Sequence, residues 1–205
     1  MVFGGRKGTG VAVVASMLAS AFLSATASAQ PPEAIQNGVT CVYERLTANR
    51  GFEVVAEVFL RDDVPENLIP QAASILDIAT RGCAEKHGWS ISRTASASDV
   101  GLYGATIDFL LGRIGQAGAA ETSVGKFKAS VAAMSSDDYA AFAEADWRSD
   151  MAFTQRLRGM ALEAGLPDTD EVMDMALEAL ELGARSDYSV SLFLLDLAHS
   201  ETPPG

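Results

Sequence analysis

The stretch VGLYGATIDFLLGRI, residues 100–114, decides the fold that this sequence predicts. Its apolar residues recur every three or four positions, which is the spacing of one face of an α-helix. The residues on that face are Val100, Tyr103, Ile107, Leu110, Leu111 and Ile114. Ser90 can cap the start of this helix, and Gly115 and Gly118 can end it. The segment therefore predicts a long amphipathic helix that packs against other helices.

Segments on both sides of this helix repeat the same spacing, and turns containing glycine, proline or serine separate them. Pro70 would break a helix running through it, so the third helix should begin near Ile69. Ser135 and Asp138 have the spacing of a capping box. We expect helices at about residues 35–46, 52–60, 69–87, 90–114, 121–134, 136–142, 147–164 and 171–185.

Residues 188–197 fit two kinds of secondary structure. Tyr188, Val190, Leu192 and Leu194 alternate as in a strand, whereas Val190, Phe193, Leu194 and Leu197 have helical spacing. No second strand is evident to pair with the first, so we favour a helix that restarts at Ser186 and Asp187. No internal repeat or linker marks a second domain. The predicted fold class is all-α, a single compact bundle of about seven to eight helices after a signal peptide.

The N-terminus has the pattern of a cleavable secretory signal peptide over residues 1–29. Arg6 and Lys7 precede an uncharged apolar run, and small residues at Ala27 and Ala29 precede Gln30. The alternative is an uncleaved membrane anchor, since the run from 10 to 29 is about long enough to span a bilayer. We expect cleavage, export to the periplasm or the extracellular space, and an α-helical domain over 30–205 that is ordered from about 33 to 198.

Charge limits the partners of the exported chain. Residues 1–29 hold two basic residues and no acidic one, so residues 30–205 carry 13 Lys and Arg against 27 Asp and Glu, a formal charge of −14. Nucleic acids and anionic membranes bind through clusters of Lys and Arg. The composition thus predicts no nucleic-acid partner, and beyond residue 29 the sequence predicts no transmembrane segment.

Cys41 and Cys83 are the only cysteines, and in an exported chain they most simply form a disulfide. One detail counts against the bond. Cys83 lies on the apolar face of its helix, whereas Cys41 points away from the face that carries Val39, Val42 and Leu46. Either the first helix is covered on two sides or the bond is absent, and we expect the disulfide.

A metal site is the sharper alternative. Cys83 and His87 are four residues apart on one helical face, and Cys41 and His199 could complete a set of zinc ligands. His199 falls in a tail that we expect to be frayed, and the chain has no Cys-x-x-Cys or His-Glu-x-x-His motif. We predict neither a metal nor another cofactor.

Four carboxylates follow one edge of the last helix: Glu171, Asp174, Glu178 and Glu181. They could bind a cation or a basic partner, but the pattern is more typical of a solvated edge, with Glu181 and Arg185 spaced for an ion pair. Asp168 and Asp170 begin like a calcium loop, yet the glycine and the later glutamate of such loops are missing.

No residue pattern identifies an enzyme, and we predict no catalytic residues. The chain has two histidines and no Gly-x-Ser-x-Gly motif, which leaves few options for nucleophilic catalysis. The sequence therefore favours a non-catalytic interaction or envelope-associated domain with an unknown protein partner. A small metal-binding protein or a hydrolase with a carboxylate-based site is the alternative.

Overall fold

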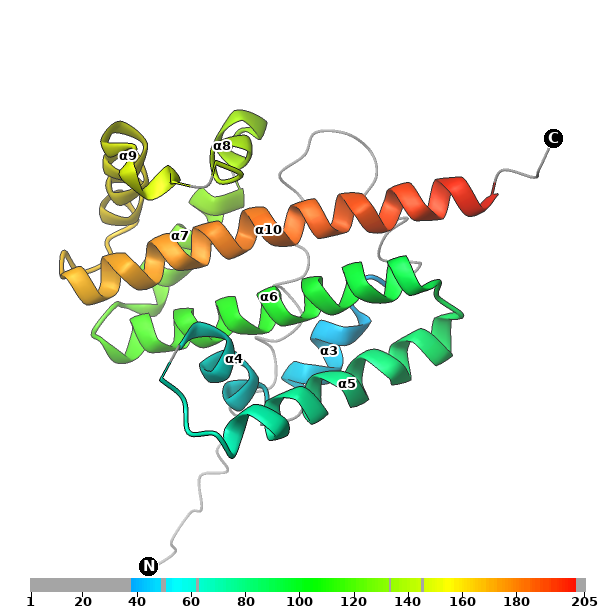
Figure 1. Cartoon of the computed structure of the whole chain (residues 1–205). Coiled ribbons are helices and arrows are strands. Elements are labelled where there is room, and N and C mark those ends of the chain that lie inside the picture. The colour runs from blue at the N-terminus through cyan, green and yellow to red at the C-terminus, as the bar shows by residue number, and fades with distance from the viewer. Residues whose placement is uncertain (1–37, 49–50, 62, 133, 145, 202–205) are drawn as a thin grey trace, which may run out of the picture.

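The computed structural model describes residues 38–48, 51–61, 63–132, 134–144 and 146–201 (Figure 1). These residues form α-helices and one short 3-10 helix, η1, and they contain no strand. The elements in chain order are α3 (Cys41–Thr47), α4 (Phe52–Leu60), α5 (Leu68–His87), α6 (Ile91–Gln116), α7 (Glu121–Ala132), α8 (Ser136–Ala141), η1 (Trp147–Ser149), α9 (Met151–Glu163) and α10 (Asp170–Glu201). The predicted all-α class is confirmed. The proposed signal peptide, and Ile35 at the start of the first expected helix, lie outside the described residues.

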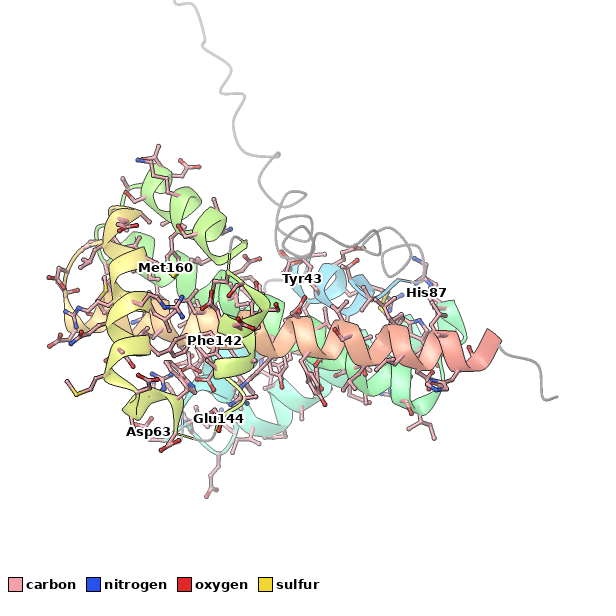
Figure 2. The ribbon with its side chains drawn as sticks, turned by 90° about the horizontal axis from the view of Figure 1, so that it is seen from above. Tyr43, Asp63, His87, Phe142, Glu144 and Met160 are labelled. Atoms are coloured by element: carbon pink, nitrogen blue, oxygen red, sulfur yellow. A yellow bond between two sulfur atoms is a disulfide. The ribbon has the colours of Figure 1, made fainter. Side chains whose placement is uncertain are left out.

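Two long helices, α6 and α10, run side by side in opposite directions along the molecule (Figure 1). The short helices α3 and α4 and the longer α5 pack against one another and against α6. At the other end, α7 and α9 pack together beside the first half of α10. Figure 2 shows Phe142 and Met160 at this end and His87 at the opposite end.

The buried apolar residues form two clusters, and α6 and α10 contribute to both. The first cluster lies between α7, α9 and the facing halves of the two long helices, with Phe127, Leu157 and Leu180 almost fully buried. The second joins α3, α4 and α5 to the start of α6 and to Phe193 of α10. Because both long helices cross from one cluster to the other, they hold the two ends of the molecule together.

Most helix ends follow the signals in the sequence. The Ser90 hydroxyl accepts a hydrogen bond from the backbone of Arg93, and Ser135 and Asp138 form the predicted capping box. Gly88 ends α5 with φ +63°, a left-handed conformation that glycine adopts without strain. Pro70 stands in the first turn of α5, where a missing backbone N–H costs no helical hydrogen bond.

Gly101 lets α3 and α6 approach closely, as its small size predicts. A Cβ atom at this position would lie 2.5 Å from the Val42 side chain and 3.0 Å from the backbone nitrogen of Tyr43. No larger residue fits without moving α3. The helix α3 packs on both α5 and α6, and Val42 is fully buried between them.

Four expectations about the C-terminal half are wrong. The segment 147–164 is two elements, because the Asp150 side chain accepts hydrogen bonds from Ala152 and Phe153 and so starts α9 afresh. In one continuous helix over 147–164, the apolar spacing would place Met151 on the same face as Trp147 and Leu157, but Met151 is 72% exposed at the start of α9. The helix favoured for 188–197 is confirmed, but it does not restart at Ser186 and is not frayed at His199, because α10 runs unbroken from Asp170 to Glu201.

Candidate functional site

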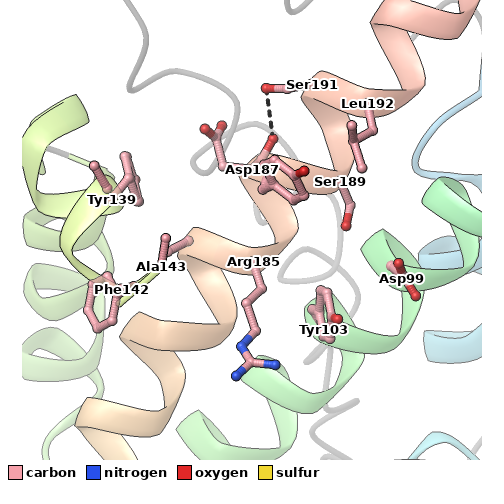
Figure 3. Close-up of a pocket in the computed structure, with 13 residues that line it drawn as sticks. Asp99, Tyr103, Tyr139, Phe142, Ala143, Arg185, Asp187, Ser189, Ser191 and Leu192 are labelled. Atoms are coloured by element: carbon pink, nitrogen blue, oxygen red, sulfur yellow. Dashed lines mark hydrogen bonds between the residues drawn. The ribbon is translucent and has the colours of Figure 1, made fainter. Parts of the chain in front are cut away.

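A groove of about 510 Å³ runs over the outward side of α10, with α6 on one flank and α8 on the other (Figure 3). The helix α8 buries none of its own residues. It is held at its two ends, because Met134 before it and Phe142 after it insert into the first core cluster. The groove therefore has one firm wall, α6, and a second wall, α8, that attaches to the core at both ends and also packs on it through the partly buried Tyr139 and Ala141.

Two carboxylates line the groove without a counter-charge. Asp187 lies on the side of α10 that faces Tyr139, and Asp99 projects from α6 on the other flank (Figure 3). Neither side chain forms a hydrogen bond or an ion pair with any residue that the structure describes. Partial burial raises the pKa of both carboxyl groups above the ordinary value, because water is partly excluded from the charged form.

Aromatic and aliphatic side chains form the rest of the surface. Tyr188 is 66% exposed and Leu192 is 39% exposed, and both line the groove. Burial, together with the negative charges of Asp187 and Asp138, raises the pKa of Tyr139 to about 12, so this phenol stays protonated at neutral pH. The groove thus presents apolar surface between two carboxylates.

Among the described residues, one basic side chain lines the groove, and it is already paired. Arg185 donates two hydrogen bonds to Glu181, with nitrogen–oxygen distances of 2.6 and 3.2 Å. The same glutamate is 3.3 Å from Arg148 of η1, which also pairs with Glu178 at 2.6 Å. The pairs of Arg148 attach η1 to α10. The charge of Arg185 is compensated by Glu181, so this guanidinium is not the main attraction for a ligand.

This surface can bind a ligand that is partly apolar and partly cationic. Desolvated carboxylates favour a bound cation, and exposed aromatic rings attract cations as well as apolar groups. No group of three or more His, Cys, Asp or Glu side chains within the described ranges could hold a metal ion. The carboxylates and exposed rings of the groove therefore favour such a ligand over a bare metal ion.

The predicted disulfide is present and joins α3 to α5. The Cys41 and Cys83 sulfurs are bonded at 2.05 Å, and the bond closes a sequence separation of 42 residues. The direction of Cys41 away from the apolar face of its helix is explained by packing on two sides. Cys41 is 6% exposed and faces α5, while Val42 faces α6.

The candidate zinc ligands do not form a site. Both sulfurs are used in the disulfide, so neither is a thiolate ligand. The His87 ring stacks on Trp89 with 5.3 Å between ring centres, and burial lowers its pKa. Its Nε2 atom is buried with no hydrogen-bond partner among the described residues. His199 lies within 2.6 Å of the Leu195 carbonyl oxygen on its own helix.

The acidic edge of α10 is less solvated than its pattern indicates. Glu181 is buried between Arg148 and Arg185, in the ion pairs described above, and the expected Glu181–Arg185 pair is confirmed. Glu171 and Asp174 are exposed, as a solvated edge requires. This edge fastens η1 to α10, and its carboxylates are not gathered around a common point.

A second polar cluster lies inside the bundle, and the sequence gives no clear sign of it. The Tyr43 hydroxyl donates a hydrogen bond of 2.7 Å to Asp108, and Lys128 of α7 lies 3.9 Å from the other oxygen of that carboxylate. Burial raises the pKa of Asp108 and lowers that of Lys128. The charges of Asp108 and Lys128 compensate each other, and the cluster links α3, α6 and α7.

Sequence reasoning missed Asp99 and Asp187 as site residues. The sequence holds a weak sign that these two carboxylates lack an ion pair, because neither has a Lys or Arg three or four positions away on its helix. Asp108 and Asp174 share this property, yet one is paired across helices and the other is exposed. Helical spacing alone does not separate these cases, since burial depends on which helices pack together.

Comparison of this chain with protein-family models, with curated proteins and with solved structures finds no match. No helix within the described residues has the length and apolar character that crossing a bilayer requires. We therefore infer the function from the groove and from the sequence.

Proposed function

We propose that this chain is an exported, non-catalytic binding domain, and that it holds a partner protein in the groove across α10. The observation that carries the proposal is an apolar surface, formed by Tyr188 and Leu192, that stays exposed beside two carboxylates without counter-charges. Exposed aromatic residues at the centre of a concave surface are typical of protein interfaces.

The charges around the groove favour binding over catalysis. A carboxylate that has lost water without gaining a partner lowers the stability of the fold, and such groups are retained where a ligand later supplies the missing charge. A hydrolase would need a nucleophile beside a base, and the groove side chains make no such hydrogen-bonded pair in the described part of the chain.

Site-directed crosslinking in intact cells tests this proposal. A photoreactive phenylalanine analogue replaces Tyr188 in one variant and Ile78 of α5 in a control. Ile78 is 60% exposed, so it tests an equally accessible apolar position away from the groove. We expect one defined partner to be captured from position 188 and not from position 78, and Leu192→Asp to abolish this capture.

Binding of the captured protein to the purified domain must then reproduce the effect of Leu192→Asp. Equal capture from both positions would reject the groove as the binding surface. Metal analysis and a thiol count on the purified protein test the rival function. One tightly held zinc per chain, or two free thiols, would favour a metal-binding protein.

A further inference from the structure

We propose that the groove recognises a basic amphipathic segment of its partner, with apolar side chains on Tyr188 and Leu192 and Lys or Arg side chains at Asp187 and Asp99. This inference rests on the proposed binding function and names the chemistry of the partner. It follows from the position of the two carboxylates on opposite flanks of one apolar strip (Figure 3).

The apolar strip has the spacing that another helix or an extended segment can follow. Tyr188, Leu192 and Leu195 are four and three residues apart, so they lie on one face of α10, and Leu195 is 56% exposed. The strip therefore continues beyond the groove toward the end of the helix. A small ligand would fill the groove alone, whereas this longer surface suits a polypeptide segment.

The negative charges of the groove and of the whole chain favour a basic segment over an acidic one. Of the described residues that line the groove, the one basic side chain, Arg185, is bound to Glu181, so Asp99 and Asp187 set the local charge. The chain as a whole is strongly acidic, with a formal net charge of −12, and it would repel an acidic partner at a distance as well as in contact. A Lys or Arg side chain at each carboxylate would supply the counter-charge that the fold lacks.

The same charges disfavour a second copy of this chain as the occupant. A symmetric dimer brings the same patch of both chains together, so the carboxylates of one groove would face those of the other. In the part of the chain that the structure describes, no lysine lines the groove to offset this repulsion. A partner with complementary charge satisfies the site, and self-association does not.

Three synthetic peptides of about 18 residues, long enough for five helical turns, test the proposal. One has Leu and Lys at helical amphipathic spacing, one has Glu at every Lys position, and one has Ser at every Leu position. We expect the full chain to bind the Leu/Lys peptide, to bind the other two at least about tenfold more weakly, and to lose affinity as salt increases. Isothermal titration calorimetry measures each affinity.

Matched variants assign the binding to the groove. Asp99→Asn with Asp187→Asn removes two charges from the groove, and Glu163→Gln with Asp174→Asn removes two from exposed positions elsewhere. We expect the groove variant to bind the Leu/Lys peptide about tenfold more weakly and the control variant to bind it like the wild type. Circular dichroism of each variant establishes that it is folded.

Three outcomes would overturn the proposal. They are failure of the Leu/Lys peptide to bind, equal weakening by the two double variants, and dimerisation through the groove in light scattering. If position 188 still captured a partner in cells, the binding function would stand and only the basic class of partner would be rejected. If neither peptide binding nor capture occurred, both proposals would fail.

Discussion

At the scale of single residues, three partly buried aspartates on the long helices differ in whether another side chain compensates their charge. Burial raises the pKa of Asp99, Asp108 and Asp187 alike. Asp108 is compensated by a hydrogen bond from Tyr43 and by the charge of Lys128. Asp99 and Asp187 have no such compensation among the described residues. The environment of Asp108 is explained by folding alone, and for Asp99 and Asp187 we propose that a ligand supplies the missing charge.

Asp187→Asn should therefore stabilise the protein at neutral pH. The raised pKa means that the folded chain binds this proton more tightly than the unfolded chain. As pH rises from the ordinary carboxyl value near about 4 through the folded-state pKa, the charge develops in the groove and the free energy of unfolding falls. The asparagine side chain of the variant does not ionise, so its free energy of unfolding does not fall in this way. We expect a gain of up to about 1 kcal/mol at pH 7, reduced because the group is partly exposed, and none at pH 3.

Urea denaturation across this pH range measures the effect, and Asp174→Asn is its control. Asp174 is an exposed carboxylate of the same helix, so its replacement gives only the general benefit of one less negative charge. An equal gain from both variants would mean that the position of Asp187 in the groove has no special cost. It would also weaken the case for a cation at this site.

At the scale of helices, α6 offers a matched pair of glycines. A Cβ atom at Gly101 would meet Val42 at 2.5 Å, whereas nothing lies within 4 Å of one at Gly112. We expect Gly101→Ala to lower the free energy of unfolding by about 1–3 kcal/mol through overpacking. Gly112→Ala should raise it by about 0.5–1 kcal/mol, since alanine is the better helix former. Denaturation curves that shift in the same direction would contradict the close approach of α3 to α6.

The disulfide acts at the same scale, because it ties the short α3 to the long α5. Closing a loop of 42 residues restricts the unfolded chain, and the chain-entropy model gives a stabilisation of about 4 kcal/mol. We expect Cys41→Ser with Cys83→Ser to lower the free energy of unfolding by about 2–4 kcal/mol. Urea unfolding with and without reductant measures this. Reductant should destabilise the wild type and leave the double variant unchanged, and identical wild-type curves would show that the bond is absent.

Helix positions were predictable from the sequence wherever a local signal sets the boundary. Ser90, Ser135 and Gly88 mark ends that depend only on nearby backbone groups, and these ends were predicted correctly. Asp150 was overlooked because a capping aspartate inside an apolar pattern resembles an ordinary polar position. The break expected at Ser186 does not occur, because Val190, Phe193 and Leu194 continue the packed face of α10 onto the second core cluster.

The groove was not predictable in this way, since it exists only where three helices converge. Asp99 and Asp187 are 88 positions apart in sequence, and their helices lie side by side only after folding. The cysteine pair was an easier inference, because the chain offers one possible bond and the predicted export favours it. The disulfide was therefore predictable from residue type. The groove was not, because its position depends on how the helices pack.

At the scale of the whole molecule, the two core clusters allow a binding surface without weakening the bundle. The antiparallel pair α6 and α10 crosses both clusters, so the floor of the groove and its α6 wall are part of the core. The helix α8 fully buries none of its own residues and packs on the core through partly buried side chains, so it is the less firmly held wall of the groove. Rigid support beneath a less firmly held wall suits a site that accepts a segment of another protein.

Export of the whole chain is the last prediction, and it depends on two alanines. Signal peptidase requires small residues at the third and first positions before the cut, here Ala27 and Ala29, and tolerates larger ones between them. We expect Ala29→Leu to prevent cleavage after residue 29, so that no recovered protein begins at Gln30. Ser28→Leu, with the same added bulk one position earlier, should be processed normally to begin at Gln30. Intact mass and N-terminal sequencing of the protein from each cell fraction measure both outcomes. Recovery of the wild-type chain from the cytosol with its leader intact, and with both cysteines reduced, would reject export.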